Sequence, residues 1–89
     1  MSDSDLDELM EFPAAFTFRA VAVTRPGLKQ ACADTVERAL ERPVQSVTAQ
    51  PSSQGKWTSV RITAEVLSAE EVLSAYTALK ALDGVRMTL

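Results

Sequence analysis

Three arginines in strand-like segments are the residues of this chain best suited to bind a charged ligand. Arg19 lies in AFTFRAVAV, Arg61 in WTSVRITAEV and Arg86 in VRMTL. A guanidinium group donates a planar fork of hydrogen bonds that matches carboxylate and phosphate groups. If the three strands are neighbours in one sheet, these side chains form a site for an anionic group. Trp57 begins the second of these segments and adds an aromatic surface to it.

A second candidate site is the turn that follows the first strand-like segment. It reads Thr24-Arg25-Pro26-Gly27-Leu28 and precedes a stretch with helical periodicity. A glycine at such a point lets a carboxylate approach the backbone amides of a helix start. Arg25 and Gly27 are therefore candidate ligand-binding residues. The alternative is a plain connection between a strand and a helix.

No pattern in the chain predicts catalysis or metal binding. The 89 residues include no histidine, so the commonest general base and metal ligand is missing. Cys32 is the single cysteine, and it falls on the apolar stripe of a predicted helix, as a core thiol does. Glu70 and Glu71 are adjacent on a predicted helix and do not converge. We expect no enzymatic activity, no metal and no cofactor.

Charge divides the chain into an acidic arm and a slightly basic body. Residues 1–11 carry five acidic residues and no basic one, while residues 12–89 carry nine basic and seven acidic residues. We expect residues 1–11 to form an acidic arm with a short helix that Phe12-Pro13 ends. The arm is either solvated or docked on a basic surface. It contains neither a basic n-region nor a long apolar run, so we expect no signal peptide, no membrane span and a cytoplasmic location.

Six elements that position these residues can be predicted from periodicity and from turn signals. They are a strand over Ala15–Val23, a helix over Pro26–Glu41, a weak strand over Val44–Gln50, a strand over Trp57–Val66, a helix from Ser68 to about Leu82 and a strand over Val85–Leu89. Ser68 and Glu71 have the spacing of a capping box, in which each side chain accepts from a helix-start amide. In the last strand, alternation predicts Val85, Met87 and Leu89 inward and Arg86 and Thr88 outward.

The β-α-β-β-α-β order predicts an α+β, ferredoxin-like split βαβ domain over residues 12–89. Its antiparallel sheet has the order 4-1-3-2, and both helices cover one face. Pro51 independently restricts the second strand to an edge. The face without helices then carries the three arginines among hydroxyl side chains: Thr17, Ser59, Thr63 and Thr88. The alternatives are that these arginines are solvated, that they pair with Glu65, or that the acidic arm shields them.

Three segments resemble the YbeD-like family of small bacterial proteins of uncertain function. They are LDELMEFPAAFTFR (Leu6 to Arg19), QPSSQGKWTSVRIT (Gln50 to Thr63) and VRMTL (Val85 to Leu89). The resemblance spans nearly the whole chain. It implies a bacterial protein of ferredoxin-like fold, similar to ACT regulatory domains, with no known enzymatic activity and an annotated link to lipoate metabolism.

The turn at Arg25 and Gly27 is also similar to the loop after the first strand of ACT domains, which bind amino acids or similar small molecules, often between paired domains. In those domains an acidic residue commonly holds the amino group of the ligand. Here Thr24 or Arg25 stands at that place. This departure argues against amino-acid binding.

Three functions follow from these residues. The first is a non-catalytic regulatory or adaptor module that binds a small anionic metabolite or an acidic protein segment. The second is nucleic-acid binding through the open sheet face, which has less support because only Trp57 offers a ring for base stacking. The third is a structural module that forms homodimers by pairing its edge strand near Val44–Gln50.

Overall fold

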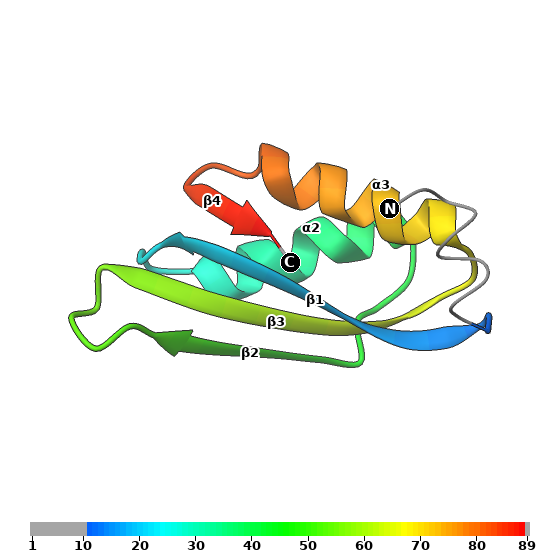
Figure 1. The fold of residues 1–89 in the computed structure, drawn as a ribbon, viewed down its shortest axis with the longest axis horizontal. Coiled ribbons are helices and arrows are strands. Elements are labelled where there is room, and N and C mark those ends of the chain that lie inside the picture. The colour runs from blue at the N-terminus through cyan, green and yellow to red at the C-terminus, as the bar shows by residue number, and fades with distance from the viewer. Residues whose placement is uncertain (1–10, 89) are drawn as a thin grey trace.

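The computed structural model describes residues 11–88, which form a two-layer α+β fold (Figure 1). Its elements are β1 (Ala14–Val23), α2 (Leu28–Leu40), β2 (Ser46–Pro51), β3 (Trp57–Val66), α3 (Ala69–Ala81) and β4 (Val85–Thr88). The predicted β-α-β-β-α-β order is confirmed. The short helix that we predict in the acidic arm falls on residues 1–10, which lie outside the described residues.

One antiparallel sheet carries all four strands, in the order β2-β3-β1-β4. This is the predicted order 4-1-3-2 read from the other edge, with β2 at an edge as Pro51 requires. Figure 1 shows α2 and α3 on the same side of the sheet. The other face of the sheet carries no helix among residues 11–88.

The core lies between the sheet and the two helices. The alternate residues of β3, from Thr58 to Val66, are buried, and Phe18 of β1 is fully buried against Tyr76 of α3 at a ring distance of 5.0 Å. Each large apolar side chain buried in this way stabilises the fold by about 1.5–3 kcal/mol. Because side chains alternate along a strand, burying one face of β3 fixes the other face toward solvent.

The first helix begins two residues later than its periodicity predicts. Gly27 precedes α2 with φ 77°, a left-handed conformation that cannot belong to a right-handed helix. Pro26 therefore stays in the connecting turn. At the other end, Glu41 is left-handed (φ 57°) and its amide bonds back to the Glu37 carbonyl at 2.8 Å, so the helix ends before Pro43.

Strand β2 begins two residues later and ends one residue later than predicted. The predicted range was Val44–Gln50, and the observed range ends at Pro51. The amide of Ser52 donates to the Trp57 carbonyl at 2.7 Å, so by alternation the nitrogen of Pro51 faces the outer edge of the sheet. A proline there removes no ladder hydrogen bond, which explains why the strand includes it.

The predicted orientation of Met87 and Thr88 in β4 is wrong, and the predicted inward position of Leu89 lies outside the described residues. Val85 lies opposite the buried Ala22 as expected, but Met87 lies opposite Val21 and Thr88 opposite Ala20. The irregularity between these pairs makes Arg86 the additional residue of a β-bulge. The bulge reverses the alternation, so that Met87 faces the open side and is 51% exposed.

A charged contact links the start of α3 to the segment that follows α2. Glu71 lies in the first turn of α3, and its carboxylate accepts a bidentate pair of hydrogen bonds from the Arg42 guanidinium, at 2.8 Å to Oε1 and 2.9 Å to Oε2. Oε1 also accepts from the Leu67 amide at 2.7 Å. Ser68 accepts from the Glu71 amide at 3.3 Å as the capping box predicts, but the Glu71 carboxylate accepts from the amide of Leu67, one residue before the N-cap. Arg42 also donates to the Glu65 carbonyl at 3.0 Å. One carboxylate thus joins the helix start to the segment after α2.

Candidate anion-binding face

Arg19 and Arg61 are directly opposite one another at the centre of the open sheet face. The amide of Thr24 donates to the Lys56 carbonyl at 3.0 Å, which makes that pair a hydrogen-bonded one. By alternation, Arg19 and Arg61 form a pair of the other class, whose Cα atoms are only about 4.5 Å apart and whose side chains approach more closely. The adjacent pair shows this proximity, because the Thr17 and Thr63 hydroxyls share a hydrogen bond of 2.9 Å.

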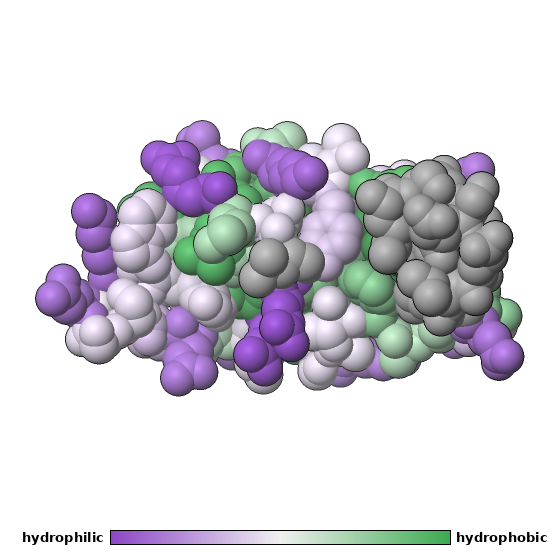
Figure 2. Space-filling model, viewed as in Figure 1, coloured by the Kyte–Doolittle hydropathy of each residue, from purple (hydrophilic) through white to green (hydrophobic). Residues whose placement is uncertain are grey.

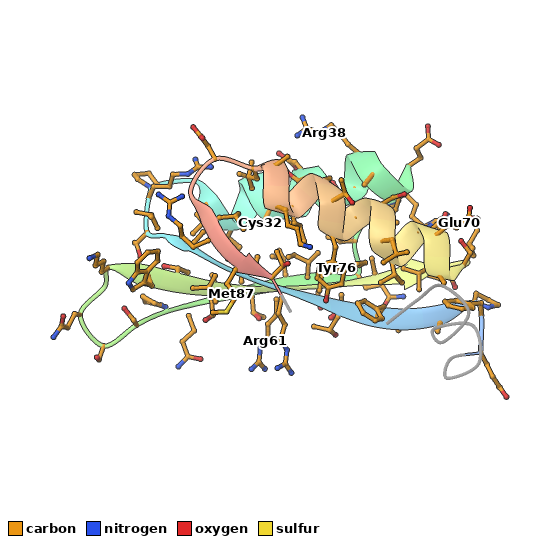
Figure 3. All side chains as sticks on the ribbon, turned by 45° about the horizontal axis from the view of Figure 1, so that its top comes forward. Cys32, Arg38, Arg61, Glu70, Tyr76 and Met87 are labelled. Carbon is orange, nitrogen blue, oxygen red and sulfur yellow. The ribbon has the colours of Figure 1, made fainter. Side chains whose placement is uncertain are left out.

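Neither arginine of this pair has an acidic partner among residues 11–88. The only ion pair in that range joins Arg42 and Glu71 on the helix side. Glu65, which the sequence offered as a partner, lies opposite Ala15 and away from the pair. Figure 3 shows Arg61 pointing away from the helix layer. Two like charges therefore face each other across two strands without a compensating group within the described residues.

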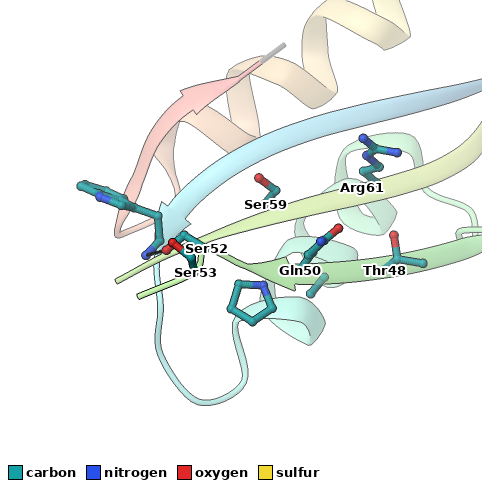
Figure 4. Close-up of a pocket in the computed structure, with 9 residues that line it drawn as sticks. Thr48, Gln50, Ser52, Ser53, Ser59 and Arg61 are labelled. Atoms are coloured by element: carbon teal, nitrogen blue, oxygen red, sulfur yellow. Dashed lines mark hydrogen bonds between the residues drawn. The ribbon is translucent and has the colours of Figure 1, made fainter. Parts of the chain in front are cut away.

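A groove beside Arg61 extends the face toward β2. It has a volume of about 460 Å³. Figure 4 shows Thr48, Gln50, Ser59 and Arg61 on the same side of the β2–β3 hairpin. Its remaining lining residues are Ala49, Pro51, Ser52, Ser53 and Trp57. The polar β2 residues were missed as site residues in the sequence, although the period-two alternation of SVTAQP would place Thr48 and Gln50 beside Arg61 and Ser59.

Trp57 lies at the end of the face nearest the β2–β3 turn. Its side chain is half-buried opposite Val23, and the Lys56 ammonium group lies 5.7 Å from its ring centroid. At that distance a cation and an indole attract one another weakly. The predicted position of Trp57 on the open face is confirmed.

Tyr76 of α3 packs on β1 from the helix side, with its ring 5.0 Å from that of Phe18 and 6.0 Å from that of Phe16. Burial raises the pKa of Tyr76, while a hydrogen bond with the Arg19 backbone and the Arg19 charge oppose that rise. The alternation that directs the Arg19 side chain outward also directs its amide away from β3, toward the edge on the β4 side. The Arg19 backbone is therefore near the helix layer, while its side chain lies on the opposite face.

Arg86 is not brought to the Arg19–Arg61 pair. As the bulge residue of β4 it has no partner on β1, and it lines a shallow depression at the β4 edge of the sheet with Lys80 of α3 and the other β4 residues. The predicted cluster of three arginines is therefore a pair. The bulge could not be predicted from four residues of strand, since alternation assumes an unbroken ladder.

The turn with Arg25 and Gly27 is also separate from the open face. It lines a depression of about 430 Å³ with Lys29 of α2 and with Ala49 and Pro51 of β2. Ala49 lies opposite Val60, a residue of the buried face, so this depression opens on the helix side of the sheet. The two candidate sites of the sequence do not form one site.

The remaining reactive groups support no catalytic site in the described part of the chain. Cys32 is fully buried and free, and burial raises the pKa of its thiol. Figure 3 places Cys32 between the sheet and the helices, as expected of a core thiol. No group of three potential metal ligands occurs within residues 11–88. Neither helix of that range has the length and apolar content to cross a membrane.

Comparison with known proteins finds relatives along the full length of the chain. Residues 7–89 match the family described as "Protein of unknown function (DUF493)". A UPF0250 protein of Shewanella sediminis is 36% identical over 89 residues and is covered completely, as is this chain. A UPF0250 protein of Vibrio vulnificus is 33% identical over 88 residues, which cover 99% of this chain and 95% of that protein.

A solved structure has the same fold. The solution structure of protein HP0495 from Helicobacter pylori matches with a TM-score of 0.77 over 100% of this chain and 94% of that one. The two sequences are 20% identical. Identity this low shows a shared fold and nothing of a shared ligand.

Proposed function

This chain belongs to the DUF493 (UPF0250) family of small bacterial proteins of unknown function, and on that premise we propose that its open sheet face binds an anionic group. The protein is a non-catalytic regulatory or adaptor module, and the ligand is a small anionic metabolite or an acidic protein segment. The observation that carries this proposal is the close Arg19–Arg61 pair, which has no acidic partner among residues 11–88.

The arrangement favours an anion because the pair is unfavourable without one. Like charges directly opposite on neighbouring strands cost about 0.2–1 kcal/mol. A phosphate or carboxylate placed between the two guanidinium groups replaces that repulsion with charge-assisted hydrogen bonds. The hydroxyl groups of Thr17, Ser59 and Thr63 flank the pair and supply further hydrogen-bond donors.

The site is exposed, so affinity for a small anion is modest. Both arginines are exposed to solvent, where water and salt screen their charges. We expect dissociation constants of about 1 mM for inorganic phosphate at low ionic strength, equivalent to about 4 kcal/mol. A larger ligand gains affinity from the groove beside Arg61.

A titration of the ¹⁵N-labelled protein with inorganic phosphate, followed by NMR, tests this proposal. We expect the side-chain Nε–H signals of Arg19 and Arg61 to shift together with the amide signals around them. The signals of Arg25 to Lys29 serve as the internal comparison. Shifts confined to that turn would contradict the open-face site. So would the absence of a saturable shift at phosphate concentrations up to about 20 times the expected dissociation constant of about 1 mM.

Removal of the acidic arm provides a further prediction. Residues 1–11 carry five negative charges and are separated by two residues from β1, the strand that carries Arg19. If the arm competes for the arginine pair, a chain beginning at Phe12 binds phosphate about threefold more tightly, because an intramolecular competitor is lost. Isothermal titration at two salt concentrations measures this effect. Superimposable isotherms for the two chains would contradict competition while leaving the binding site itself in place.

A further inference from the structure

A strip of apolar side chains lies beside the arginine pair on the open face. The β4 bulge places Met87 opposite Val21, and Trp57 lies opposite Val23. Val21 and Val23 are two residues apart on β1 and so point to the same face. These four residues, Val21, Val23, Trp57 and Met87, are here called the apolar strip. Figure 2 shows hydrophobic surface between hydrophilic side chains on one side of the molecule.

The apolar strip is close enough to the arginines for one small ligand to contact both. Val21 is two residues from Arg19 on β1, and Ser59 is two residues from Arg61 on β3. Two residues along a strand span about 6.6–6.8 Å. That distance equals the length of a short alkyl chain or of one aromatic ring with its substituent.

The strip is not explained by the core. Met87 is 51% exposed although the alternation of its strand would have buried it, and the bulge turns it outward. An exposed methionine and a half-buried indole, on the two strands that flank Val21 and Val23, form an adaptable apolar surface, since the methionine side chain is unbranched and polarizable. A ligand that covers this surface gains free energy in proportion to the apolar area removed from water.

We infer that the ligand of the open face is an amphiphilic anion, with its charged head between Arg19 and Arg61 and its apolar group on the strip of Val21, Val23, Trp57 and Met87. This inference rests on the proposed function, since it names the ligand class of the same site. The head group is a phosphate or a carboxylate. The apolar group is short, because the strip ends at the β2–β3 turn.

Trp57 is the only tryptophan of the chain, so its fluorescence reports binding directly. The probes are inorganic phosphate, hexyl phosphate and phenyl phosphate, with hexanoate to compare the two head groups. We expect hexyl phosphate to bind about tenfold more tightly than inorganic phosphate, because partial burial of six carbons gives a fraction of their full transfer free energy. Hexyl phosphate is the longest of these probes and is expected to change the Trp57 emission most, because Trp57 lies four residues from Arg61 on β3.

Met87→Ser and Leu67→Ser form a matched pair of variants. Met87 and Leu67 are 51% and 52% exposed, but Leu67 lies in the connection before α3 rather than on the open face. Met87→Ser is expected to weaken the binding of hexyl phosphate about threefold and to leave the affinity for inorganic phosphate unchanged. Leu67→Ser is expected to leave both affinities unchanged.

The outcomes separate this inference from the proposed function. If inorganic and hexyl phosphate bind equally at the arginines, the amphiphilic ligand class is wrong and the anion site remains. If neither binds, both are wrong. If Leu67→Ser weakens hexyl phosphate binding as much as Met87→Ser does, the apolar contact is nonspecific and the inference is overturned.

Discussion

A chain in which Arg19 and Arg61 are both replaced by glutamine is expected to bind inorganic phosphate at least tenfold more weakly and to unfold at a higher temperature. Loss of two charge-assisted contacts accounts for the weaker binding. Removal of the cross-strand repulsion raises the free energy of unfolding by about 0.5 kcal/mol. For a domain of this size that corresponds to about 2–4 °C in Tm. Isothermal titration and a thermal melt measure the two effects.

The control is a second double variant, Arg38→Gln with Lys80→Gln, which removes the same charge from the helices. Both residues are exposed, and each lies in the last turn of its helix, where a cation interacts favourably with the helix dipole. Figure 3 shows Arg38 on the helix layer, away from the open face. This variant is expected to retain phosphate binding and to lose stability. Equal losses of affinity in the two double variants would mean that net charge alone attracts the anion, and would end the proposal of a specific site.

Sequence patterns locate the arginine pair only in part. Arg19 and Arg61 lie at outward positions of two long strands whose inward residues are apolar except for Thr58, so alternation alone places them on one face. Their direct opposition could not be predicted, because it depends on the register between β1 and β3. That register is fixed by the packing of residues such as Phe18 and Ile62, 44 positions apart in the chain.

The failures of the sequence-based prediction come from short elements. Strand β4 has four residues, and one irregular residue was enough to turn Met87 to the open face and Thr88 toward the core side. Strand β2 is polar and its side chains are largely exposed, so no buried face marked its limits or the groove beside it. The Arg42–Glu71 contact joins residues 29 positions apart, for which a capping pattern gives no signal. Self-pairing through the outer edge of β2 stays a prediction.

Glu71→Ala is expected to have the largest effect of any single substitution of a charged residue, lowering the free energy of unfolding at pH 7 by about 1 kcal/mol. The Glu71 side chain retains a quarter of its exposure, so solvent reduces the value of its bonds. The Arg42 hydrogen bonds and the Leu67 amide hold the pKa of Glu71 below its ordinary value of 4.5. A group whose pKa is lowered by folding stabilises the native state above its unfolded pKa. The difference in free energy of unfolding between the wild type and Glu71→Ala is therefore expected to be constant above about pH 5. It is expected to shrink as the pH falls below 4.5.

Urea unfolding at pH 7 and at pH 3.5 measures this difference, and the neighbouring residue provides its control. Glu70 also lies in the first turn of α3 but is exposed and forms no ion pair among residues 11–88. Glu70→Ala is expected to cost a few tenths of a kcal/mol through the helix dipole, about 0.3 at low ionic strength. Glu71→Gln keeps an acceptor for the Leu67 amide and removes the charge, so its cost is expected to lie between the other two. If Glu71→Ala and Glu70→Ala lower the free energy of unfolding equally at pH 7, the Arg42–Glu71 contact contributes nothing measurable to stability. The start of α3 is then held by Ser68 and by core packing alone.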